Sequence, residues 1–148
     1  MTQANVVLVV QRKIGASAER LFDAWTKPEL MKKWFHAGKD WTTPMAENDL
    51  RVGGDWRIQM AKPDGVTLFP GMGKYKLIER PTKLVFTWHP FAQEDYETTI
   101  TLTFKKVSDE VTEFTLTQEG LRSEKDKADH NGGWDGCLGC LADFASAK

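Results

Sequence analysis

Residues 130–148 read HNGGWDGCLGCLADFASAK, and this stretch decides the fold of the chain. With about 100° of rotation per helical residue, its large apolar side chains fall on one stripe. The stripe consists of Trp134, Leu138, Leu141 and Ala145, with Cys137 and Phe144 beside it. The pattern predicts one amphipathic helix over Asp135–Lys148 that begins near His130. Its apolar stripe must pack against another part of the protein.

The chain before this helix is strand-like along most of its length. From Trp41 onward apolar and polar residues alternate, most clearly over 56–60, 84–88, 98–107 and 114–117. A period of two is typical of half-buried antiparallel strands. Residues 121–129 are interpreted as a charged approach to the final helix.

The amino-terminal part adds one strand and two short helices. Asn5–Ile14 is rich in β-branched residues, Ser17 is a good helix N-cap, and Pro28 starts a second helix that we expect to reach Gly38. The order is therefore one strand, two short helices, about six strands and one long helix. This order indicates an α+β fold in which a curved antiparallel sheet wraps around a long C-terminal helix. We expect residues 1–148 to form a single domain.

Composition excludes several classes of partner. Twenty basic and 21 acidic residues give a net charge of −1, and neither sign forms a long run, so no nucleic acid or membrane partner is expected. The apolar run 6–10 is too short for a signal peptide or a membrane span, which predicts a cytoplasmic protein. Two cysteines make no disulfide framework, in agreement with a reducing compartment.

Catalytic and metal chemistry find little support in the sequence. Cys137 and Cys140 form a C-x-x-C inside the predicted helix, where we interpret them as small packing or pocket-wall residues. Zinc held by these two and His130 is conceivable, but no fourth donor is evident, and His130 is interpreted as a structural cap. Asp55 and Glu79 are not convincing acids or bases. We therefore expect no catalytic residue, no metal and no cofactor, and we favour a non-enzymatic protein.

Aromatic residues carry the stronger hypothesis, because one face of the predicted sheet and the helix stripe together enclose an apolar space. Such a space suits a small hydrophobic ligand; a fully packed core without a void is the alternative. Residues 68–73 are interpreted as an aromatic, glycine-hinged loop at the rim, or else a β-bulge. The predicted ligand-binding residues are Trp41, Trp56, Met60, Phe69, Phe86, Trp88, His130, Trp134, Cys137, Leu138 and Leu141.

Several short motifs, taken together and in this order, carry a family likeness. They are SAERLFDAWT (17–26), PELM (28–31) with Trp34-Phe35, GGDW (53–56), GKY (73–75), IERP (78–81), LVFTW (84–88), and the closing His130, Gly133-Trp134 and Leu138. Through them the chain resembles the homologues of the activator of heat-shock protein 90 ATPase, within the START-like (SRPBCC) helix-grip superfamily. The likeness covers nearly the whole chain.

The resemblance implies a helix-grip fold with a pocket, and it leaves three functions open. These are binding of a small apolar or amphipathic ligand, which we favour, a protein-interaction module related to chaperone activators, and an enzyme of the cyclase or hydrolase kind. Eukaryotic activators carry an additional N-terminal domain, whereas this sequence starts at the helix-grip strand, so a chaperone partner has little support. Gly136 and Gly139 lie off the apolar stripe and suggest close contact with another element or a second copy in a homodimer.

Overall fold

A computed structural model describes residues 5–146, apart from the side chain of Phe91. The elements, in chain order, are β1 (Val6–Ile14), α1 (Ala18–Thr26), α2 (Pro28–Trp34), β2 (Thr42–Asn48), β3 (Asp55–Ala61), β4 (Leu68–Glu79), β5 (Lys83–Trp88), the 3₁₀ turn η1 (Pro90–Ala92), β6 (Thr98–Ser108), β7 (Val111–Leu121) and α3 (Glu124–Ser146). This order confirms the predicted α+β fold.

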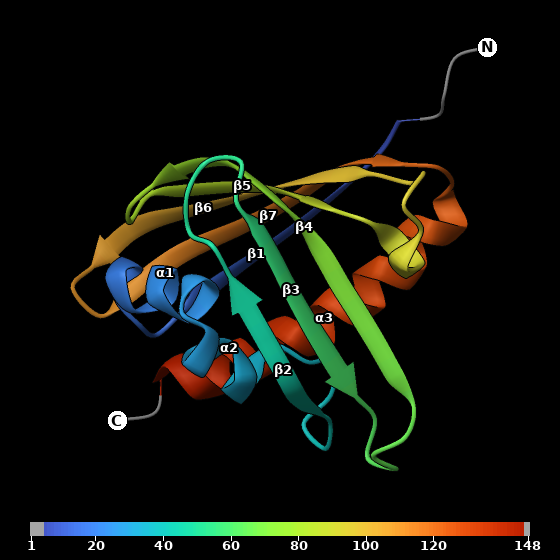
Figure 1. Cartoon of the computed structure of the whole chain (residues 1–148). Coiled ribbons are helices and arrows are strands. Elements are labelled where there is room, and N and C mark those ends of the chain that lie inside the picture. Colours follow the sequence, from blue (N-terminus) through green and yellow to red (C-terminus); the bar gives the residue numbers. More distant parts are fainter. Residues whose placement is uncertain (1–4, 147–148) are drawn as a thin grey trace.

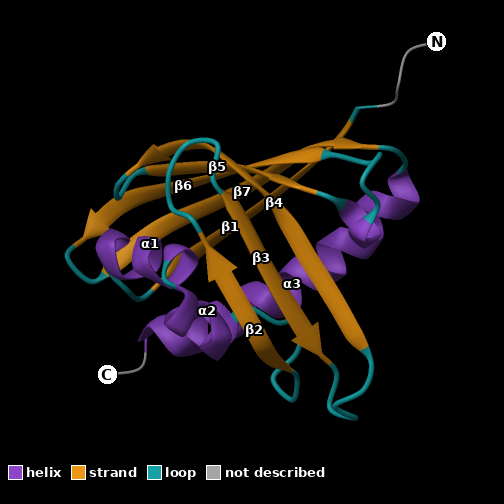
Figure 2. Ribbon diagram, viewed as in Figure 1, coloured by secondary structure: helices purple, strands orange, loops and turns teal. Residues whose placement is uncertain are grey.

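Seven described strands form one antiparallel sheet in the order β1-β7-β6-β5-β4-β3-β2. The sheet is curved, and α3 runs across its inner face, while α1 and α2 lie near the last turns of α3 (Figure 1). Colouring by secondary structure shows α3 passing behind β2, β3 and β4, with α1 and α2 near one end of it (Figure 2). The helix packs closely along β1 and β7, at one edge of the sheet.

The strand alternation predicted from the sequence produces the inner face. On β6, Ile100, Leu102 and Phe104 are buried, and in the antiparallel register they lie opposite Gln118, Leu116 and Phe114 of β7. The threonines between them point to the outer face. One side of this hairpin is therefore apolar, apart from Gln118, and forms the floor on which α3 lies.

The final helix is longer than the sequence indicates. It begins at Glu124, where the backbone N–H of Asp126 donates to Ser123 Oγ at 3.0 Å, so Ser123 is the cap. The predictions of a helix start near His130, after a charged approach over 121–129, and of a capping role for His130 are thus wrong. The error arose because the first turns of α3 carry no large apolar residue, and a periodicity argument cannot detect them. Similarly, α2 ends at Trp34 rather than at Gly38.

Residues 68–73 also differ from the prediction. They are neither a hinged loop nor a bulge but the first part of β4, in regular register with β3. A Cβ at Gly71 would lie 2.8 Å from the ring of Trp88, and one at Gly73 would lie 1.8 Å from the Thr87 carbonyl oxygen. Gly71 and Gly73 therefore allow close packing against β5, which explains why the strand has no side chain at these two positions.

A buried chain of hydrogen bonds connects α3 to three strands. Trp134 Nε1 donates to Gln118 Oε1 at 2.9 Å, and Gln118 Nε2 donates to Thr98 Oγ1 at 3.0 Å. Thr98 Oγ1 donates in turn to the backbone carbonyl of Trp88 at 2.8 Å. Gln118 is 0% exposed, so its amide would be costly to bury without these partners. Helix, β7, β6 and β5 are thereby fixed relative to one another.

Arg20 of α1 binds the far end of α3. Its Nε donates to the carbonyl of Ala145 at 2.6 Å, and a second guanidinium nitrogen donates to the carbonyl of Phe144 at 3.3 Å. The last carbonyls of a helix lack partners within the helix and carry a partial negative charge. The Arg20 guanidinium donates hydrogen bonds to these carbonyls and offsets their partial negative charge. It thereby connects α1 to the end of α3.

Gly136 explains how closely α3 approaches the rest of the chain. A Cβ at this position would lie only 1.9 Å from the carbonyl oxygen of Ala37, which follows α2, whereas one at Gly139 would meet no atom within 4 Å. The contact suspected from the sequence thus exists at Gly136, within the chain itself, and the structure gives no such reason for Gly139.

This difference predicts opposite effects of two matched substitutions. Gly136→Ala should destabilise the protein by about 1–3 kcal/mol, because the new methyl group collides with backbone. Gly139→Ala should stabilise it by about 0.5–1 kcal/mol, since alanine favours the helix and meets no obstacle. Urea unfolding followed by circular dichroism measures both, and equal effects would contradict the close approach at Ala37.

Truncation of Trp134 should be among the most damaging single changes. The side chain is 3% exposed, and its removal as Trp134→Ala should cost about 3–5 kcal/mol. Trp134→Phe keeps an aromatic ring but leaves Gln118 Oε1 without its donor, so a smaller loss of about 1–3 kcal/mol is expected. A melting temperature unchanged by Trp134→Ala would show that α3 is not docked through this residue.

Candidate ligand-binding site

A pocket of about 400 Å³ opens between α3 and the adjoining ends of β3, β4 and β5. It lies away from the edge of the sheet against which α3 packs. Its lining residues are Phe35, Ala37, Met60, Leu68, Phe69, Pro70, Trp88, Asp129, His130, Gly133, Trp134 and Cys137. A pocket of this size lies within the range that small organic ligands occupy.

Three buried aromatic rings from different elements form its inner wall. Phe35 follows α2, Trp88 ends β5, and Trp134 lies in the middle of α3. The ring centroids of Trp88 and Trp134 are 5.4 Å apart, and the Phe35 centroid lies 6.4 Å and 6.1 Å from them, respectively. Because the hydrogen-bonded chain fixes Trp134 and the backbone of Trp88, this wall is already formed without a ligand.

The rim of the pocket is apolar and exposed. Leu68 and Phe69 of β4 are 46% and 40% exposed, a high fraction for side chains of this type. Trp41 stacks against Phe69 with a centroid distance of 5.3 Å, and the Lys62 ammonium lies 5.7 Å from the centre of the Phe69 ring. These two residues brace the rim from outside the pocket.

Few polar groups reach the pocket. Asp129 is exposed at its edge, and the ring of His130 is held by its own helix, since Nδ1–H donates to the carbonyl of Asp126 at 2.9 Å. Burial raises the pKa of the Cys137 thiol well above its usual range, and Cys140 adds to that shift. The thiol is thus neutral at physiological pH. Among the described residues, no group of three or more His, Cys, Asp or Glu side chains is arranged to hold a metal ion.

The structure brings about half of the predicted ligand-binding residues together. Met60, Phe69, Trp88, His130, Trp134 and Cys137 line the pocket. Trp41 stands behind the rim, while Trp56, Phe86, Leu138 and Leu141 are buried deeper in the core. The protein therefore has both a pocket and a packed core. Of the predicted residues on the sheet, some line the pocket and the others belong to the core.

Six lining residues were missed from the sequence: Phe35, Ala37, Leu68, Pro70, Asp129 and Gly133. Asp129 was missed because the start of α3 was placed too late, and Gly133 because it adds no side chain to the apolar stripe. Leu68 and Pro70 were assigned to a loop, and the sequence does not show which other elements a loop contacts. A detectable signal existed only for Phe35, which adjoins Trp34 in an aromatic pair directly after a helix.

A second, larger groove of about 650 Å³ lies on the outer side of β2, β3 and β4. Charged side chains line it, and most of its basic and acidic groups form ion pairs with one another. Lys74 Nζ lies 2.6 Å from Asp55 Oδ1, and Arg57 forms an ion pair with Glu47. Exposed pairs of this kind contribute little and leave little net charge for a ligand. The smaller pocket beside α3 is therefore the better candidate site.

Within residues 5–146, no helix combines the length and the apolar character needed to cross a bilayer. The fold and the pocket together define a helix-grip protein, in which a curved antiparallel sheet closes over a long helix and leaves an apolar pocket beside it. Comparison with known proteins supports this assignment of the fold. The family described as "Activator of Hsp90 ATPase homolog 1-like protein" matches residues 15–146, and the chain belongs to this family.

Solved structures with the same fold include an AHSA1-like protein from Aeromonas hydrophila, at 25% identity and a TM-score of 0.80, covering 94% of this chain and 91% of that one. A protein from Chromobacterium violaceum has 20% identity and a TM-score of 0.82, covering 97% and 99%. An HSP90 activator from Plasmodium falciparum has 20% identity and a TM-score of 0.68, covering 90% and 91%. No curated protein sequence matches the chain.

The buried thiols lead to a prediction about reactivity. In the folded protein at pH 8, Cys137 and Cys140 should react with Ellman's reagent at least about 100-fold more slowly than in the unfolded chain, because burial raises both thiol pKa values and blocks access. Replacement of both by alanine should change stability only modestly. Fast labelling of the native Cys140→Ala variant would contradict a buried, unreactive Cys137.

Proposed function

We propose that this protein binds a small apolar or amphipathic molecule in the pocket between α3 and the rim formed by β4, without catalysing a reaction on it. The observation that carries this proposal is the pocket itself. It is open, its walls are largely aromatic and aliphatic, and its charged or titratable side chains come only from α3. Apolar walls with few polar anchors are the usual composition of a small-molecule site.

The position of the polar groups supports an amphipathic ligand. Asp129 and His130 lie on neighbouring positions of α3, and Asp129 is exposed to solvent. Phe35, Trp88 and Trp134, in contrast, are buried. A ligand would therefore place its apolar body against the three rings and its polar end toward the helix and the solvent.

Two buried N–H groups near the pocket support a role beyond stability. Nε1 of Trp25 and Nε1 of Trp88 have no hydrogen-bond partner within the described part of the chain, and each such group typically costs about 1–3 kcal/mol. Both rings belong to the aromatic cluster around Phe35, since Trp25 lies 5.2 Å from it between centroids and Trp88 lies 6.4 Å away. A buried polar group without a partner calls for an explanation, and a polar atom of a bound ligand or a bound water beside this cluster would supply one.

An enzymatic role finds weaker support. General acid–base catalysis needs titratable groups placed on both sides of a reacting atom. Asp129 and His130 are adjacent on one helix, and the Cys137 thiol is kept neutral by burial. The homodimer suggested by the glycines of α3 stays a hypothesis, and a chaperone partner stays the less favoured alternative.

Gly133 offers a direct test of the proposed site. It lines the pocket, and a Cβ at this position would meet no atom within 4 Å, so Gly133→Phe should fill the pocket without disturbing the helix. Gly132 has the same open surroundings but does not line the pocket, which makes Gly132→Phe a matched control. We expect the native protein and the control to bind the uncharged dye N-phenyl-1-naphthylamine in equimolar amount. Binding to Gly133→Phe should be at least about tenfold weaker.

Dye fluorescence and tryptophan emission report the binding, and thermal unfolding checks that both variants fold. The affinity should depend little on salt, because apolar contacts are not screened by ions. Equal dye binding by all three proteins would place the dye elsewhere, and no binding by any of them would contradict the proposal.

A further inference from the structure

We infer that the side chain of Phe35 closes the inner end of the pocket and thereby sets the length of the apolar ligand that it accepts. The inference rests on the proposed function. It concerns a specificity-determining residue that the aromatic pattern of the sequence alone did not single out.

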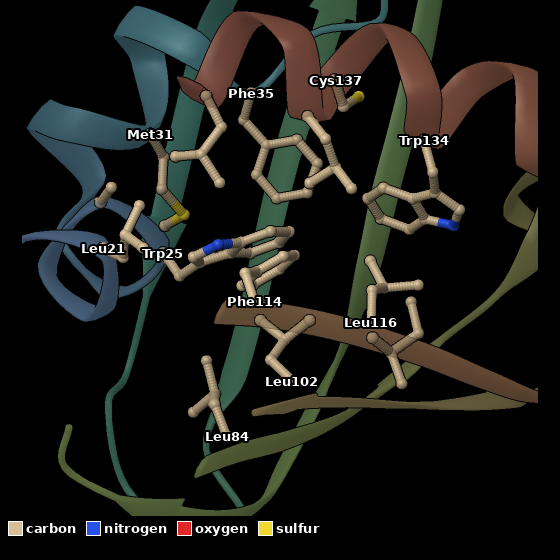
Figure 3. Close-up of a cluster of buried hydrophobic side chains, with 14 of the residues drawn as sticks. Leu21, Trp25, Met31, Phe35, Leu84, Leu102, Phe114, Leu116, Trp134 and Cys137 are labelled. Atoms are coloured by element: carbon tan, nitrogen blue, oxygen red, sulfur yellow. The ribbon is translucent and has the colours of Figure 1, made fainter. Parts of the chain in front are cut away.

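Phe35 lies between the pocket and a second, inner void. That void measures about 10 Å³, about the space of one water molecule, and is lined by Trp25, Met31, Phe35, Trp56, Tyr75 and Phe86. Among the described residues, Phe35 alone lines both spaces. In Figure 3 its ring lies between Trp25 and the helix that carries Cys137. The ring is therefore the partition between an open pocket and an unfilled part of the core.

The backbone of Phe35 is fixed, so only its ring is able to move. Its N–H donates to the carbonyl of Met31 at 2.9 Å, and its own carbonyl accepts from Thr43 Oγ1 at 2.7 Å. Because the Thr43 hydroxyl proton is used in that bond, Nδ1–H of the buried His36 must donate to Thr43 Oγ1, at 2.9 Å. These bonds connect the end of α2 to β2 and leave side-chain rotation as the remaining freedom.

The groups behind the ring suit an apolar extension. Met31 has a flexible thioether that adapts to neighbours of different shape. Trp56 and Phe86, 5.3 Å apart between centroids, present apolar ring surface. Both were predicted from the sequence to contact a ligand, yet they lie on the inner side of Phe35. A ligand in the pocket beside α3 reaches them only when the Phe35 ring is absent or turned aside.

The ring contacts hold Phe35 in its closing position. It stacks on Trp34 with a centroid distance of 4.7 Å and meets Trp25 edge-on at 5.2 Å. Each such pair stabilises the closed rotamer. The native protein should therefore discriminate against apolar chains longer than the outer pocket, because such chains must break these contacts.

A series of straight-chain 1-alkanols from hexanol to dodecanol tests this inference, with affinity measured by tryptophan fluorescence. In the native protein the affinity should rise about fourfold for each added methylene until the chain reaches Phe35, and then level off. In Phe35→Leu and Phe35→Ala the rise should continue to longer chains, further in the alanine variant. Phe104→Leu is the matched control, since Phe104 is equally buried but lines neither space.

The outcomes separate the two proposals. If the native protein binds the alkanols and the limiting chain length is the same in Phe35→Leu and Phe104→Leu, the inference about Phe35 is wrong while ligand binding stands. If the native protein binds no alkanol at any length, the proposed function itself fails. Phe35→Leu keeps the test decisive even where Phe35→Ala does not fold.

Discussion

The chain of buried hydrogen bonds from Trp134 through Gln118 and Thr98 to the carbonyl of Trp88 is the constraint on which the rest of the structure depends. Apolar packing alone would let a helix slide or rotate on a sheet, because it is not directional. Buried polar groups without partners are costly, so only one position of α3 satisfies all of them together. The same bonds therefore fix the fold and two of the three rings that form the inner wall of the pocket.

The position of α3 also explains why a pocket exists at all. The helix packs along β1 and β7, at one edge of a seven-stranded sheet, whereas β3 and β4 lie near the other edge. A sheet this wide curves past a single helix, and side chains fill only part of the space beneath it. Aromatic residues after α2 and at the end of β5 occupy most of that space, and the remainder opens at the rim by Phe69. The pocket thus follows from the number of strands and the off-centre helix.

Much of this architecture could be predicted from the sequence, because each element buries one regular face. The apolar stripe of Trp134, Leu138 and Leu141 predicted the final helix. The alternation that includes Phe86 and Trp88 predicted the strands, and all five side chains are buried. The start of α3 and the strand nature of residues 68–73 could not be predicted in this way. In the first case the turns are polar, and in the second Gly71 leaves room for a ring of the next strand. The division of aromatic residues between pocket and core depends on tertiary packing, which periodicity does not encode.

The glycines of α3 have a consequence for the dynamics of the site. Gly132, Gly133, Gly136 and Gly139 lie within two turns, and each lowers intrinsic helix stability by about 1 kcal/mol relative to alanine. A peptide of this sequence would have little reason to be helical in water. The order of the helix beside the pocket thus comes from docking rather than from its own backbone. Segments of this kind open locally more readily than the strands they cover, and their amide hydrogens exchange sooner with solvent. The wall of the pocket that α3 supplies is, in that sense, its most labile wall.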